Sequence, residues 1–200
     1  MCGIVGYIGN KHNGVQVVLD GLQSLEYRGY DSAGVAYIDD DHKGHVAKQV
    51  GQVANVRRAI GADAGKRIPL VIGHTRWATH GSPTIKNAHP HFNTDQTIFV
   101  VHNGIIENSA ILKDRLEKAG YVFITQTDTE VIPHLIDFHF KKTKSFKKAF
   151  DIALQELEGA YAIAAITSEE PDTLFAARLS SPLVVGVGEE EYYIASDPTA

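Results

Sequence analysis

The stretch Cys2-Gly3-Ile4-Val5-Gly6 opens the chain with the pattern of an apolar strand and places the only cysteine of the sequence at its second residue. Small second residues permit removal of the initiator Met1, and Cys2 would then carry a free α-amine beside its thiol. An α-amine titrates at about 7.7 to 8.0 and a thiol at about 8.5, so the pair can share a proton and form a thiolate near neutral pH. The alternative is that Cys2 simply begins a buried strand, because free cysteines are among the most buried residue types. By position alone, the buried strand is the simpler interpretation.

Hydrophobic periodicity indicates that strands and helices follow in a layered α+β order. The strand at 2–9 is followed by an apolar repeat at helical spacing, which stops at Arg28-Gly29. Further strands are expected at 33–38, 45–50, 69–75, 97–102, 160–167, 173–178, 183–187 and 191–195, and further helices at 52–60, at 108–119, from about residue 129, and at 145–157. We expect Asn108 to cap the helix that follows it. The long polar stretch at 76–96 is expected to line a site, because such loops are often functional.

Composition limits the kinds of protein that this chain can be. The 200 residues are 44% hydrophobic and 22% charged, which fits one domain with a sizeable core. No apolar run approaches the roughly 20 residues that span a bilayer, and no secretory signal precedes the first strand. We therefore predict a cytoplasmic protein that does not bind a membrane. The formal net charge is −5 and the basic clusters are short, so no nucleic-acid partner is predicted either.

Four further segments concentrate glycine and polar residues where periodicity calls for apolar ones, and they are listed here: Tyr27-Arg28-Gly29-Tyr30-Asp31-Ser32-Ala33-Gly34, His74-Thr75-Arg76-Trp77-Ala78-Thr79-His80-Gly81, His102-Asn103-Gly104 and Thr127-Asp128-Thr129-Glu130. Each has a structural explanation of its own. Asn103-Gly104 is typical of a hairpin turn, Thr129 of a helix cap, and Arg28-Gly29 of a helix end. Together with an N-terminal cysteine, however, they supply a nucleophile, donors for an oxyanion, a cation and an anion. That set is what the cleavage of an amide in a free amino acid requires.

With these segments, and with Asn87-Ala88-His89-Pro90 and Val101-His102-Asn103-Gly104-Ile105-Ile106-Glu107-Asn108, the chain resembles the glutaminase (type II glutamine amidotransferase) domains of the glutamine-fructose-6-phosphate aminotransferase family. The resemblance covers nearly the whole chain. Tyr30 and Trp77 favour this sugar-amine branch over other amidotransferases with an N-terminal cysteine. The resemblance implies a four-layer αββα sandwich of the N-terminal-nucleophile hydrolase type, with residues 1–200 forming one glutaminase domain.

The resemblance also implies roles for individual residues in the hydrolysis of L-glutamine to glutamate and ammonia. Cys2 is expected to form a glutamyl thioester, while the Asn103 side chain and the Gly104 backbone N–H bind the oxyanion. Arg76 is expected to hold the substrate carboxylate and Asp128 its ammonium. Four further site residues are carried over from the family: Thr79, His80, Trp77 as a mobile gate for ammonia, and Arg28.

The predicted cofactors and partners rest on motif spacing and on the same resemblance. Ten histidines raise the possibility of a metal site, but no His-Glu-x-x-His or paired-cysteine spacing occurs, and the chemistry needs no Lewis acid. No metal and no cofactor are therefore predicted. In the family an isomerase domain follows and receives the ammonia, so this chain is expected to be an excised domain that makes no amino sugar from fructose 6-phosphate. The alternatives are a catalytically silent amino-acid-binding module and an amidotransferase domain that serves another ammonia acceptor.

Overall fold

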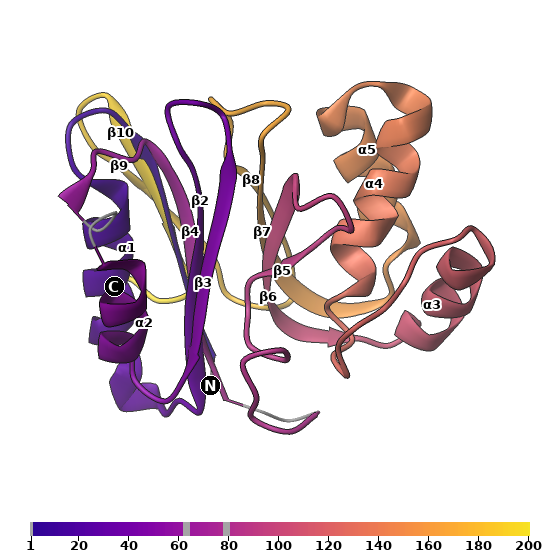
Figure 1. The fold of residues 1–200 in the computed structure, drawn as a ribbon, viewed down its shortest axis with the longest axis horizontal. Helices are drawn as coiled ribbons and strands as arrows, with labels where there is room; N and C mark the ends of the chain where they lie inside the picture. The colour runs from indigo at the N-terminus through magenta and orange to yellow at the C-terminus, as the bar shows by residue number, and fades with distance from the viewer. Residues whose placement is uncertain (1, 62–64, 78–80) are drawn as a thin grey trace.

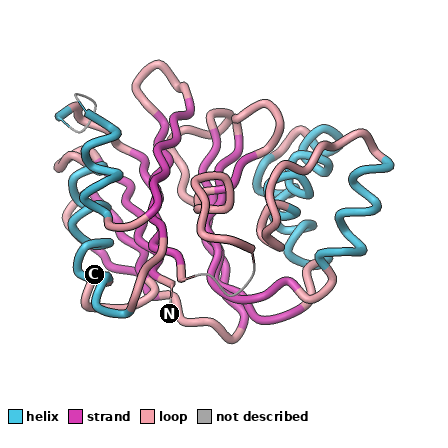
Figure 2. Tube along the Cα trace, turned by 60° about the horizontal axis from the view of Figure 1, so that its bottom comes forward, coloured by secondary structure: helices cyan, strands magenta, loops and turns pink. Residues whose placement is uncertain are grey.

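The computed structural model describes residues 2–61, 65–77 and 81–200 as four stacked layers, with two antiparallel sheets enclosed between two helical layers (Figure 1). The tube in Figure 2 shows the same order, with the strands at the centre and the helices outside. The αββα sandwich that the family resemblance implies is therefore confirmed. No helix in the described part of the chain has the length and apolar character needed to cross a bilayer.

The first sheet has the strand order β3-β2-β4-β1-β10-β9. Its strands are β1 (Gly3–Gly9), β2 (Ser32–Ile38), β3 (Gly44–Val50), β4 (Leu70–Arg76), β9 (Val184–Val187) and β10 (Glu191–Ala195). The outer face of this sheet carries α1 (Gly14–Ser24) and α2 (Val53–Ile60). Asn13 caps α1 by accepting from the backbone N–H of Val15 at 3.1 Å. α1 ends at Ser24, earlier than the predicted stop at Arg28-Gly29, and a separate 3₁₀ turn, Glu26–Arg28, carries the chain on to Gly29.

The second sheet has the order β5-β6-β7-β8, with β5 (His91–Phe92), β6 (Ile98–Ile106), β7 (Gly159–Thr167) and β8 (Phe175–Leu179). Its outer face carries α3 (Ser109–Lys118), α4 (Val131–Thr143) and α5 (Phe146–Glu156). Ser145 caps α5 by accepting from the Lys148 N–H at 3.4 Å. Asn108 holds the N-cap position of α3, as predicted, but its side chain makes no capping hydrogen bond. Its side chain bonds instead to the Glu156 carbonyl at 2.8 Å and to the Glu158 N–H at 3.2 Å, which fastens α3 to the end of α5.

Three apolar cores separate the four layers: one beneath α1 and α2, one between the sheets, and one beneath α3, α4 and α5. Strand residues alternate between the faces of a sheet. On β4, Leu70 and Ile72 belong to the core between the sheets, whereas Val71 belongs to the core under α1 and α2. Because both faces are buried, the central strands are continuous apolar runs in the sequence.

Candidate active site

The candidate site lies where the core between the two sheets gives way to polar residues at the ends of β4 and β6. The alternation along β4 that buries Leu70 and Ile72 between the sheets places His74 and Arg76 on the same face. On β1, Ile4 belongs to that core, so Cys2, two residues earlier, approaches the same interior. The alternation of side chains along each strand thus directs these three polar side chains toward the second sheet.

The same alternation on β6 directs Asn103 toward the first sheet. Phe99 and Val101 lie in the core between the sheets, and Asn103 continues their row. The Asn103 side-chain Nδ2 donates to the backbone carbonyl of Cys2 at 3.1 Å. The proposed oxyanion donor on β6 therefore contacts the residue directly before β1, which belongs to the other sheet.

Cys2 is half-buried, and the backbone of Trp77 holds its sulfur. The Trp77 N–H donates to Cys2 Sγ at 3.2 Å, and the thiol lies 3.6 Å from the Trp77 carbonyl oxygen as acceptor. Burial raises the pKa of the Cys2 thiol, and the Trp77 N–H offsets only part of this effect. In these surroundings the thiol needs a base to become a nucleophile.

Gly104 lies within β6, so the hairpin turn that Asn103-Gly104 alone would indicate does not form there. The φ of Gly104 is +127°, and a Cβ at this position would lie 2.0 Å from the carbonyl oxygen of Ala160 on β7. Only glycine fits, because the space that a side chain needs is filled by the neighbouring strand. Its backbone lines the same pocket as Cys2.

Arg76 and Asp128 bring opposite charges to this pocket. Arg76 is buried at 4% exposure, and its guanidinium donates to the carbonyls of Gly81 at 3.3 Å and Ser82 at 3.4 Å. Asp31, to which no role in the site was assigned from its motif, lies 3.9 Å from the same guanidinium. A buried cation held by carbonyl oxygens is suited to a substrate carboxylate.

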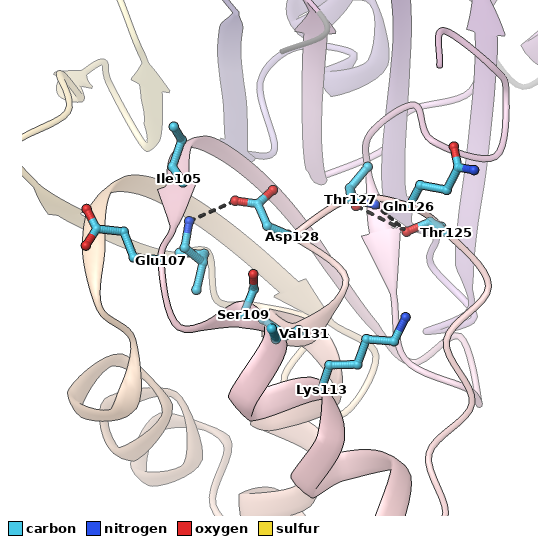
Figure 3. Close-up of a pocket in the computed structure, with 11 residues that line it drawn as sticks. Ile105, Glu107, Ser109, Lys113, Thr125, Gln126, Thr127, Asp128 and Val131 are labelled. Carbon is cyan, nitrogen blue, oxygen red and sulfur yellow. Dashed lines mark hydrogen bonds between the residues drawn. The ribbon is translucent and has the colours of Figure 1, made fainter. Parts of the chain in front are cut away.

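Asp128 belongs to the loop before α4. Its Oδ2 accepts from the Ile106 backbone N–H at 2.8 Å, a bond drawn in Figure 3. This contact fastens the loop to the end of β6. The other carboxylate oxygen, Oδ1, lies 3.5 Å from the Thr129 hydroxyl.

The pocket that contains Cys2 is small, about 50 Å³ within the described part of the chain. Its lining is Cys2, His74, Arg76, Trp77, His89, His102, Gly104, Thr127, Asp128 and Thr129. A second pocket of about 410 Å³ lies beside it and shares Thr127 and Asp128 (Figure 3). The loop that carries the proposed ammonium ligand therefore lines both pockets.

The pocket is backed by a cluster of four buried histidines, His74, His89, His91 and His102, to which the sequence assigned no catalytic role. Burial lowers the pKa of each one, to about 3 for His74 and about 4 for His102. All four are therefore neutral at physiological pH. Within residues 2–61, 65–77 and 81–200, no group of three or more His, Cys, Asp or Glu residues is placed to hold a metal ion.

Thr129 completes this cluster through its hydroxyl, which lies 2.9 Å from His102 Nδ1. The helix cap suggested by its neighbours is not formed, because Glu130 precedes α4 and makes no side-chain cap bond. Several histidines fall within the quoted motifs, and this could have indicated the cluster. Sequence alone does not show that their rings stack on one another.

The remaining predicted residues are placed differently. Thr79 and His80 lie outside the described residues. The Trp77 side chain is 52% exposed, at the mouth of the site, and its ring packs against Gly29. Arg28 is not among the residues that line the pocket, and its guanidinium pairs with Asp197 at 3.5 Å. Its role in the site stays a prediction.

Comparison with known proteins supplies the family. Residues 74–200 match the model of the glutamine amidotransferase domain. The chain belongs to that family. It is 51% identical over 98% of its length to the glutamine-fructose-6-phosphate aminotransferase (isomerizing) of Clostridium tetani, and 49% identical over its whole length to the enzyme of that name in Bacteroides thetaiotaomicron. The resemblance read from the motifs is thereby confirmed, as is the prediction of a glutamine amidotransferase.

These relatives are longer than the chain, which spans 32% of each. Among solved structures, the glutamine phosphoribosylpyrophosphate amidotransferase from B. subtilis superposes with a TM-score of 0.80 at 30% identity. That match covers 98% of this chain and 42% of the other. The family's architecture is thus shared with an amidotransferase that carries a different name.

Proposed function

We propose that this amidotransferase domain hydrolyses L-glutamine to glutamate and ammonia with Cys2 as its nucleophile. One observation carries the proposal. The Cys2 thiol, the Gly104 backbone, the Arg76 guanidinium and the Asp128 carboxylate all line one pocket, and the Asn103 amide lies beside it at 3.1 Å from the Cys2 carbonyl. Free glutamine presents the matching groups, since it carries one carboxylate, one ammonium and one side-chain amide.

The chemistry proceeds through a thioester. Cys2 Sγ attacks the carboxamide carbon of glutamine while the Cys2 α-amine, free once Met1 is removed, takes the thiol proton. The carbonyl oxygen becomes an oxyanion, to which Asn103 and Gly104 donate. Its collapse breaks the C–N bond, and the nitrogen leaves as ammonia with the proton from the α-ammonium. Water then attacks the thioester, which releases glutamate and restores the thiol.

Substrate selection rests on charge. Arg76 binds the α-carboxylate through two parallel N–H groups, and Asp128 pairs with the α-ammonium. Glutamine within a peptide lacks both charges and is therefore excluded. Thr79 and His80 are proposed to complete the pocket, with Trp77 as a gate and Arg28 as a further site residue. No metal and no cofactor enters any of these steps.

The ammonia acceptor is proposed from the relatives. Their name and their 49 to 51% identity to this chain support a longer protein in which an isomerase region receives ammonia and converts fructose 6-phosphate to glucosamine 6-phosphate in the cytoplasm. For this chain alone we expect glutamate formation and no amino sugar when fructose 6-phosphate is added.

The deciding experiment measures ammonia release by protein whose N-terminal mass is known, and compares wild type with Cys2→Ala. We expect turnover by the Met1-free wild type and none by the variant, which should still bind glutamine. Binding without turnover by the Met1-free protein would instead indicate a silent amino-acid-binding module. The raised pKa of the thiol is the observation that favours that alternative when Met1 is retained.

A further inference from the structure

The imidazole of His74 joins the two sheets at the amide proposed to bind the oxyanion. His74 lies on β4, paired with Ile4 of β1, whereas Asn103 lies on β6. His74 Nε2 is 2.9 Å from Asn103 Oδ1 and 3.1 Å from the backbone carbonyl oxygen of His102. One ring nitrogen therefore faces two oxygen atoms on the opposite sheet.

The carbonyl of His102 fixes the tautomer of this ring. A backbone carbonyl oxygen only accepts hydrogen bonds, so the nitrogen that faces it must carry the proton. His74 is consequently an Nε2–H donor. Its Nδ1 is buried and has no hydrogen-bond partner in the described part of the chain, which suits an unprotonated nitrogen better than a stranded N–H.

A donor at His74 in turn fixes the orientation of the Asn103 amide. An amide flip would set its NH₂ against the His74 N–H and its oxygen against the Cys2 carbonyl oxygen, so that both contacts become repulsive. In the orientation observed, Oδ1 accepts from His74 and Nδ2 donates to Cys2 O at 3.1 Å. An amide nitrogen carries two N–H groups. The second one is left for the substrate oxygen.

The ring itself is held against rotation and against protonation. It stacks on His89 with centroids 4.1 Å apart and an interplanar angle of 15°. Burial lowers the pKa of His74 to about 3, so its donor and acceptor roles stay the same near neutral pH. The His89 Nδ1 accepts from the His102 backbone N–H at 3.3 Å, which ties the stack to β6.

We propose that His74 is a positioning residue for Asn103, which holds the amide with its NH₂ toward the nucleophile and the developing oxyanion. The inference rests on the proposed function and deepens it. His74 does not touch the substrate amide in this role, so its contribution passes entirely through Asn103.

The test uses three single-residue variants of the chain, one double variant and one control. His74→Leu removes the donor, and its kcat for glutamine hydrolysis should fall about 10- to 100-fold with unchanged KM, less than the about 100- to 1000-fold expected for Asn103→Ala. His74→Gln, which keeps a donor near the Nε2 position, should recover most of the loss. His139→Leu is the control, since it removes another largely buried histidine, one paired with Glu156 at 2.8 Å in the helical layer, and should leave kcat unchanged.

Two readouts separate positioning from loss of structure. Alkylation of Cys2 by iodoacetamide forms no oxyanion, so its rate should be the same in His74→Leu and wild type. In the Asn103→Ala background, His74→Leu should cost nothing further, because the residue through which it acts is already absent. Additive losses, or a parallel fall in alkylation, would overturn the inference.

A measurement that does not depend on turnover keeps this inference apart from the proposed function. In ¹⁵N-labelled protein, the His74 ring should show the Nε2–H tautomer, and the Nδ1–H tautomer would refute the assignment even in an active enzyme. Wild type that releases no ammonia while His74 shows the Nε2–H tautomer would contradict the proposed function alone.

Discussion

Trp77 holds the sulfur of Cys2 through its backbone, with its N–H 3.2 Å from Sγ. Arg76 immediately precedes Trp77 in the chain and closes β4. Two consecutive residues thus set the site: Arg76 is the proposed carboxylate ligand, and Trp77 positions the nucleophile. The end of β4 therefore determines the distance between the attacking sulfur and the α-carboxylate of the substrate.

Retention of Met1 should leave Cys2 slow to react. Burial raises the pKa of the thiol, so less thiolate is present at pH 7 than in an unstructured peptide. The rate of iodoacetamide alkylation should therefore rise as pH increases beyond the ordinary thiol range, and should lie below that of a cysteine peptide at pH 7. A rate equal to that of the peptide would show that burial does not control the thiol.

Gly104→Ala should disable the site and destabilise the fold. The added Cβ meets the Ala160 carbonyl at 2.0 Å, and φ is +127°. Overpacking and strain of this kind cost roughly 1–3 kcal/mol each, so the free energy of unfolding should fall by at least that much, and kcat should fall with it. Gly120→Ala is the matched control, because Gly120 also has a positive φ (+92°) but nothing lies within 4 Å of its added Cβ. Equal effects in the two variants would mean that the strand contact is unimportant.

Asp128→Asn should weaken glutamine binding more than it slows chemistry. The amide oxygen can still accept from the Ile106 N–H, which Asp128 Oδ2 now accepts at 2.8 Å, so the loop should stay in place. The lost charge removes a charge-assisted hydrogen bond worth about 1.5–3 kcal/mol, which raises KM about 10- to 150-fold. Asp114→Asn, which alters an exposed pair with Lys118, should leave KM unchanged. A large fall in kcat at constant KM would argue against an ammonium ligand.

Glu130 should make stability depend on pH in the acid range. Burial opposes its ionisation, but the His134 ring 3.8 Å away and hydrogen bonds from the Ile124 N–H and from the Thr125 N–H and hydroxyl outweigh burial and lower its pKa to about 2. The lowered pKa contributes stability that is fully present above the unfolded value of 4.5 and is lost as pH falls toward 2, on the order of 3 kcal/mol in all.

Chemical denaturation of wild type and Glu130→Gln at several pH values measures this contribution. The variant should be less stable at pH 7, and the difference should shrink below pH 4.5. Glu117→Gln, at an exposed position of α3, should show no such convergence. A difference that stays constant with pH would show that the carboxylate charge is not responsible.

Much of the fold was predictable because its signals are local. Apolar runs with both faces buried predicted the central strands, and helical spacing predicted α1, α3 and α5. The pairing of the strands was not predictable, because β6 pairs with β7 across more than 50 residues that contain three helices. The same long-range pairing overrides the turn signal at Asn103-Gly104 and extends β6 to Ile106.

Part of the candidate site was predictable from local motifs and part was not. Cys2, Arg76, Gly104 and Asp128 could be named from motifs, and the structure places all four on one pocket. The capping bond predicted for Asn108 does not form because its side chain bonds instead to residues at the end of α5, a contact that has no local signal in the sequence. The arrangement around His74 was missed for a similar reason, since both of its acceptors lie on a strand that begins more than 20 residues later.

The pocket is assembled from both sheets: Arg76 lies on β4 of one sheet, Cys2 directly precedes β1 of that same sheet, and Gly104 lies on β6 of the other. Turnover therefore depends on the distance between the two sheets, and the apolar side chains packed between them set most of that distance. A repacked residue in that core, such as a larger or smaller side chain at Ile72, would shift one sheet against the other while each sheet kept its own hydrogen bonds. In a denaturant titration of such a variant, turnover should be lost at a lower denaturant concentration than the circular dichroism signal. Turnover would then detect a change in the distance between the sheets that circular dichroism does not.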